Sequence, residues 1–111
     1  MLYRNVEQGI RCERLKAVAS EANRNARNWE DQAIDLEQRN NSENGRPDDL
    51  RRQADRTGDH EAFEPDIRRL EDYINNLQRQ VIVAEDNARQ WRDEVGQLEN
   101  EMAGAGCYGF A

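Results

Sequence analysis

Long apolar runs are missing from this chain of 111 residues, and aromatic residues make up only 6% of it. No stretch approaches the roughly 20 apolar residues that a helix needs to span a bilayer, and no signal peptide is visible in the polar start of the chain. Only 36% of the residues are hydrophobic and 35% are charged, which is too little apolar material for a compact globule. We expect a cytoplasmic protein, in the host cytoplasm if a virus encodes it, with no membrane partner.

Cysteine and histidine are scarce, and their positions give no sign of a chemical site. Cys12 and Cys107 lie near opposite ends of the chain without metal-ligand spacing, and in the intracellular protein expected above we predict reduced thiols. His60 is the only histidine, and a single histidine among acidic neighbours is typical of a solvated side chain. No activated nucleophile, phosphate-binding loop or metal motif is present. We therefore expect no enzyme activity and no cofactor.

The charge is acidic, with 23 acidic and 16 basic residues and a net charge of −7. A protein that neutralises nucleic-acid phosphates needs a basic face, so no direct nucleic-acid partner is expected. An acidic chain can still seek basic surfaces on other proteins.

Apolar residues recur at alternating intervals of three and four between Ile67 and Met102 without a miss. This 3.5-residue repeat is typical of a helix that packs along another helix. An internal repeat predicts a similar helix in the first half of the chain. The segment Asn25-Ala26-Arg27-Asn28-Trp29-Glu30-Asp31 is matched 62 residues later by Asn87-Ala88-Arg89-Gln90-Trp91-Arg92-Asp93. The predicted core seam consists of Leu15, Trp29, Leu36, Ile74, Leu77, Val81, Trp91, Val95 and Leu98.

These patterns predict an all-α fold, an antiparallel hairpin of long helices with a short helix at the bend. We expect one domain over 1–103, with helices over about 10–40, 47–57 and 65–103, and a flexible, glycine-rich tail over 104–111. Pro47 and Pro65 would each open a helix. A register that sets Ala22 opposite Ala88 would let the two backbones approach closely. A parallel homodimer through the second long helix is the rival arrangement.

Two groups of side chains outside the seam are candidates for interaction. Ile34, Ile82 and Val83 are apolar at positions that the seam does not bury, and such residues usually mark a contact. Their cover could be Leu50, Ala54 and Phe63 of the same chain or a second protomer. Five arginines near the bend could bind an anion or an acidic partner, although neighbouring carboxylates can neutralise them: Arg51, Arg52, Arg56, Arg68 and Arg69.

The function that fits best is a non-enzymatic helical protein–protein interaction module. It would associate with itself through the seam, most simply as a dimer of hairpins that forms a helical bundle, and would bind another protein. One alternative is a small acidic inhibitor, of the phage anti-defence type, that blocks a basic surface of a nucleic-acid-processing target. A third is a sponge for a small anionic ligand.

Overall fold

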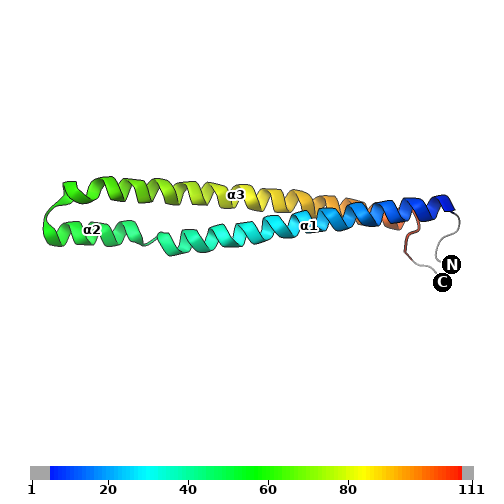
Figure 1. The fold of residues 1–111 in the computed structure, drawn as a ribbon, viewed down its shortest axis with the longest axis horizontal. Helices are drawn as coiled ribbons and strands as arrows, with labels where there is room; N and C mark the ends of the chain where they lie inside the picture. The colour runs from blue at the N-terminus through cyan, green and yellow to red at the C-terminus, as the bar shows by residue number, and fades with distance from the viewer. Residues whose placement is uncertain (1–5, 109–111) are drawn as a thin grey trace. The chain divides into compact units, whose positions relative to one another are not determined.

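The computed structural model describes residues 6–108, which form three α-helices and no strand. The helices are α1 (Val6–Glu43), α2 (Arg46–Thr57) and α3 (His60–Gly104) (Figure 1). They divide into two compact units. Unit 1 combines the chain up to Glu30 with the chain from Asp86 onward, and unit 2 is Asp31–Glu85.

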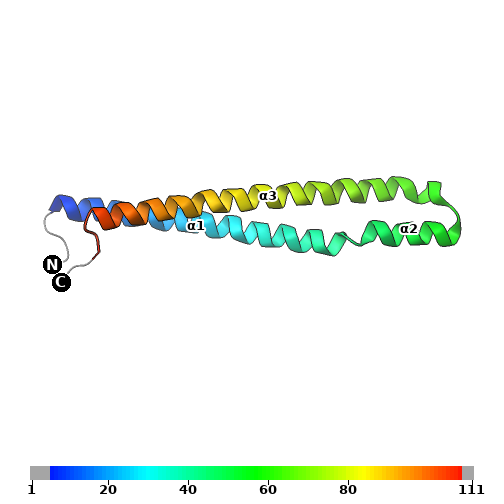
Figure 2. The ribbon, with the colours of Figure 1, turned by 180° about the vertical axis from the view of Figure 1, so that it is seen from behind.

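Each unit pairs antiparallel helices. In unit 1, the first part of α1 lies beside the last part of α3, and the segment after α3 turns back toward α1 (Figure 2). In unit 2, the end of α1 and the whole of α2 lie along the first part of α3. The all-α antiparallel hairpin that the heptads predict is therefore confirmed.

Turn residues separate the helices where the sequence predicts. After α1, the Asn44 backbone N–H still donates to the Asn40 carbonyl oxygen at 2.9 Å, and Gly45 precedes α2. Pro47 lies in the first turn of α2, where a missing N–H costs nothing. Gly58 ends that helix with a φ of 73°, a left-handed conformation that favours glycine.

The long helix α3 begins at His60, not at Pro65 as the sequence analysis expected. The Asp59 carboxylate accepts a hydrogen bond at 3.3 Å from the Ala62 N–H, one of the unpaired amides at the start of the helix. Pro65 therefore lies inside the helix. The prediction was wrong because it assigned the start to the proline and missed the aspartate cap.

The two units are filled by residues of different size. In unit 2 most of the buried volume comes from large aliphatic side chains, namely Leu36, Ile67, Ile74 and Leu77. In unit 1 the buried set is poorer in large side chains: Cys12, Ala22, Ala26, Ala88, Leu98, Met102 and Cys107. Burial of an extra methylene contributes about 0.8 kcal/mol, so the seam of unit 1 contributes less stability for its length.

The helix register of unit 1 differs from the predicted register, in which Ala22 lies opposite Ala88. Placing Ala22 opposite Ala88 would bring Cys12 level with Leu98, whereas in the structure Cys12 packs in one cluster with Met102 and Cys107. The helices are therefore offset from the prediction by at least one turn. The prediction considered only side-chain volumes, and it took no account of the polar and covalent links between α1 and α3.

Candidate functional site

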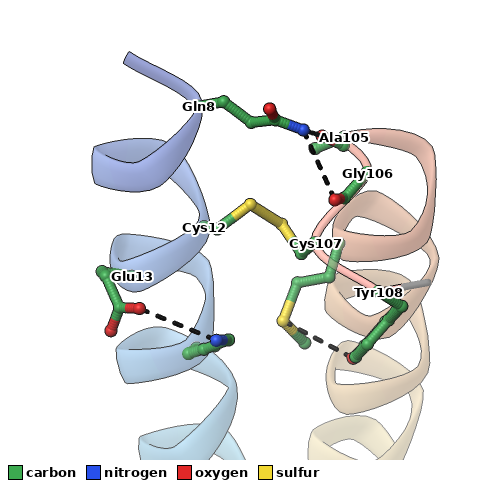
Figure 3. The surroundings of a disulfide bond; sticks show 9 residues. Gln8, Cys12, Glu13, Ala105, Gly106, Cys107 and Tyr108 are labelled. Atoms are coloured by element: carbon green, nitrogen blue, oxygen red, sulfur yellow. Dashed lines mark hydrogen bonds and ion pairs between the residues drawn. A yellow bond between two sulfur atoms is a disulfide. The ribbon is translucent and has the colours of Figure 1, made fainter. Parts of the chain in front are cut away.

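A disulfide bond joins Cys12 of α1 to Cys107, just beyond α3 (Figure 3). The two residues are 95 positions apart in the sequence, their Cα atoms are 5.5 Å apart, and both side chains are buried. Neither cysteine is free. The expectation of reduced thiols was wrong, since sequence spacing alone does not reveal which cysteines the fold brings together.

Glycine and backbone hydrogen bonds carry Cys107 back against α1. After Gly104 the chain turns at Gly106, which has a φ of 75°. The Cys107 N–H then donates to the Met102 carbonyl oxygen at 2.9 Å. This hydrogen bond holds Cys107 close to the end of α3. A flexible tail was expected over 104–111, but residues 105–108 turn back so that Cys107 bonds to α1. Residues 109–111 lie outside the described part of the chain.

A glutamine of α1 fixes the same turn from the other side. The Gln8 side-chain Nε2 donates to the Ala105 carbonyl oxygen at 2.8 Å and lies 3.4 Å from that of Gly106. A Cβ atom at position 106 would be only 2.7 Å from this nitrogen, so a larger residue would displace the Gln8 amide, and the φ of 75° itself favours glycine. The disulfide and the amide together tie the two chain ends of unit 1.

Arg92 makes the second link between α1 and α3 in unit 1. Its Nε and Nη2 both donate to Glu30 Oε1, the former at 3.1 Å, and its Nη1 donates to Asn23 Oδ1 at 2.6 Å. Glu30 and Arg92 are equivalent positions of the internal repeat, 62 residues apart. The repeat is visible in the sequence, but this pair was not predicted; its signal is the reversal of charge between otherwise matching segments.

Membership of the seam does not guarantee full burial. Leu36, Ile74, Leu77 and Leu98 are buried, whereas Leu15, Trp29, Val81, Trp91 and Val95 are half-buried. Trp91 lines a shallow surface depression with Val18, Ala22 and Asn25. An indole is larger than these small neighbours can cover, and part of its ring stays in contact with solvent.

Most arginines of the candidate cluster are paired with carboxylates of unit 2. Arg51 bonds to Asp48 at 2.9 Å and to Glu71 at 3.0 Å. The hydrogen bond and charge of Glu71, followed by those of Asp48, raise the pKa of the Arg51 guanidinium above its ordinary value. Within 4 Å, Arg52, Arg68 and Arg69 pair with Asp49, Glu64 and Asp66, respectively. Arg56 lies in the last turn of α2. These guanidinium groups are exposed but largely neutralised.

The lone histidine and the acidic residues do not converge. His60 Nε2 lies 3.3 Å from Asp55 Oδ1 in an exposed position. Across residues 6–108, no three or more His, Cys, Asp or Glu side chains are grouped so that they could hold a metal ion.

The apolar candidates remain uncovered by the chain itself. Ile34, Ile82 and Val83 are 55%, 59% and 55% exposed. Ala54 is buried and Leu50 and Phe63 are half-buried within unit 2, so this group does not provide the intramolecular cover that we considered. In the heptad, Ile34 and Ile82 both occupy b positions and Val83 a c position, which lies toward the other edge of its helix.

Comparisons of the chain with protein-family models, curated proteins and solved structures find no significant match. None of the helices built by residues 6–108 carries an apolar stretch sufficient to cross a lipid bilayer. The function therefore has to be inferred from the side chains described above.

Loss of the disulfide should destabilise unit 1 more than unit 2. The bond closes a loop of about one hundred residues, so the Cys12→Ala/Cys107→Ala variant should lose on the order of 4 kcal/mol of unfolding free energy through the added entropy of its unfolded chain. Urea unfolding followed by circular dichroism measures the loss, and hydrogen exchange should show it first in amides of unit 1.

Reductant supplies the control for this variant. Dithiothreitol should lower the stability of the wild-type chain to that of the double variant and leave the variant itself unchanged. Equal unfolding midpoints for oxidised and reduced wild type would show that the bond contributes nothing.

Exchange of the Glu30 and Arg92 charges should distinguish a true link from a chance contact. Arg92→Glu brings two carboxylates together and should cost about 1–2 kcal/mol, whereas the Glu30→Arg/Arg92→Glu variant should recover most of it. Chemical unfolding at low and high salt measures both changes, and the difference should shrink at high salt.

Arg89 is the matched control for the charge exchange. Its guanidinium pairs at 3.2 Å with Asp86 of the same helix, so Glu30→Arg should not rescue Arg89→Glu. If Glu30→Arg rescued both variants equally, the effect would be one of net charge and the proposed link would fail.

Proposed function

We propose that this protein is a non-enzymatic helical interaction module whose contact surface is the outer face of unit 2. The a and d side chains pack mainly inside the chain's own units, and the most exposed apolar side chains of unit 2 lie outside the seam. We therefore propose that a partner packs against this outer face as an added layer, and not through a seam shared between two chains.

The exposure of Ile34 and Ile82 is the observation that carries the proposal. Each side chain is more than half exposed on a helix whose opposite side is buried. Isolated apolar residues are common on surfaces, but these two occupy the same heptad position on paired helices of one unit. Full burial of an exposed isoleucine contributes about 1.5–3 kcal/mol, and a partner that covers both residues would gain about half of that for each, because each is already partly buried.

The acidic inhibitor is a special case of the same proposal, in which the bound surface belongs to a nucleic-acid-processing protein. The acidic net charge supports it. The anion sponge has less support, because Arg51, Arg52, Arg68 and Arg69 already pair with carboxylates of their own unit.

Affinity capture with three oxidised full-length baits tests the contact surface. We expect wild type to retain a partner, Ile82→Glu to lose it because a buried charge is costly, and Ile10→Glu to keep it. Ile10 is the matched control, since it is 49% exposed and lies in unit 1. Quantitative mass spectrometry of proteins from the native cell, including untagged copies of the chain, gives the comparison.

Identical retention of the partner by all three baits would contradict the assignment of the contact surface to unit 2. The absence of any partner retained by wild type above an untagged control would contradict the interaction function itself.

We also propose that the chain works in an oxidising compartment, in place of the cytoplasm that the composition first indicated. The support is the disulfide, because glutathione and thioredoxin keep cytosolic thiols reduced in most cells. The bond also joins two buried cysteines from opposite ends of unit 1.

Thiol trapping in the native cell tests the compartment. Cells lysed in acid and treated with a maleimide that adds mass should yield an unmodified chain, and prior reduction should add two labels, one for each cysteine. Two labels without prior reduction would show that both cysteines are free thiols in the cell, and would contradict the oxidising compartment.

A further inference from the structure

Negative charge is concentrated in unit 2. Residues 31–85 contain 14 acidic and 8 basic residues, a net charge of −6, whereas the remaining residues contain 9 acidic and 8 basic, a net charge of −1. The unit that contains Ile34 and Ile82 therefore carries nearly all of the excess charge of the chain.

Part of this excess lies directly beside the isoleucines. Asp31 and Glu37 are three residues before and after Ile34, and Glu85 is three residues after Ile82, spacings that put side chains on one face of a helix. Many other carboxylates of unit 2 are paired, for example Asp48 with Arg51 and Glu64 with Arg68. Among residues 6–108, by contrast, Asp31, Glu37 and Glu85 have no cationic partner within 4 Å.

The heptad places Glu37 and Glu85 on the same edge of the helix pair. Both occupy e positions, and in an antiparallel pair the e edges of the two helices face the same side. Unit 1 shows what this edge looks like when it is balanced, because there the e residues Glu30 and Arg92 form an ion pair. Glu37 lies one heptad after Glu30 and Glu85 one heptad before Arg92, and at these e positions of unit 2 there are two carboxylates without an arginine between them.

From this juxtaposition we infer that the e edge of unit 2 binds a basic amphipathic helix of another protein. The inference rests on the proposed interaction function and names the chemistry of its partner. Apolar side chains of the partner would cover Ile34 and Ile82, and an arginine or lysine would reach Glu37 and Glu85. An amphipathic helix supplies both kinds of contact at helical spacing, and a guanidinium between carboxylates forms strong charge-assisted hydrogen bonds.

A second copy of the chain fits this edge poorly. Two units of net charge −6 would meet, with the carboxylates of one edge against those of the other, and like charges across an interface oppose binding. A positively charged partner is attracted electrostatically to this edge, whereas a second copy of the chain is repelled by it.

Two synthetic peptides test the chemistry of the occupant. Both carry leucine at the a and d positions of three heptads, but one has arginine and lysine elsewhere and the other has glutamate. By fluorescence anisotropy at about 0.15 M ionic strength with the oxidised full chain, we expect the basic peptide to bind and the acidic peptide not to bind. Binding should weaken as salt increases.

Paired variants separate a local site from general charge attraction. Glu37→Gln/Glu85→Gln should weaken binding of the basic peptide about fivefold to tenfold, and Ile82→Gln about tenfold or more. The matched control is Glu94→Gln/Glu99→Gln, which removes the same charge from exposed positions of unit 1 and should leave the affinity within twofold.

Equal weakening by the two double variants would overturn the inference, as would failure of the basic peptide to bind. Sedimentation of wild type as a dimer that Ile82→Gln dissociates would also overturn it, because a second copy would then occupy the edge. In each of these cases, loss of capture by Ile82→Glu alone would still support the interaction function, so the two proposals fail separately.

Discussion

The rest of the structure depends on one constraint, an apolar stripe only two residues wide on each long helix. Such a stripe loses its contact with water only when it lies along another stripe of the same repeat. The chain meets this requirement internally, because the helix after the bend returns antiparallel and the two copies of the repeat face each other. Buried leucine and isoleucine side chains in unit 2 follow from this arrangement, as does the surface left to charged residues.

Unit 1 meets the same constraint with smaller side chains. Ala22, Ala26 and Ala88 are buried there, and alanine allows close approach of the helices but removes little apolar area from water. Polar and covalent links add what the seam of unit 1 lacks: the Arg92 hydrogen bonds and the disulfide at the chain ends. Unit 2 has more large apolar side chains. It also contains a destabilising feature, because Oδ1 of Asn40 is buried without a hydrogen-bond partner among the described residues. Such an atom typically costs 1–3 kcal/mol, and asparagine at an a position can select one register over others.

Periodicity was enough to predict the helices, because it follows from local spacing, but it left a parallel homodimer as a rival to the antiparallel hairpin. The features that were missed depend on residues far apart in the chain. Nothing near Cys12 indicates that it meets Cys107, and volume matching cannot choose a register when several alanines are interchangeable. Had the two cysteines been assumed to pair, they would have placed Cys12 near the end of the last helix and corrected the register. The half-burial of Trp91 had no such signal, because it depends on how little its alanine neighbours cover.

The e positions contain one pair of residues that stabilises the fold and one pair that does not. A duplicated helix that pairs with its own copy presents equivalent residues to each other, and at Glu30 and Arg92 a reversed charge turns repulsion into an ion pair. One heptad after Glu30 and one heptad before Arg92, Glu37 and Glu85 occupy the e positions of unit 2 without such a reversal, beside two exposed isoleucines. An arginine at either position would serve the stability of the isolated chain better. Folding therefore accounts for the balanced part of the edge but not for the unbalanced part, and a cationic partner from outside would supply the missing charge.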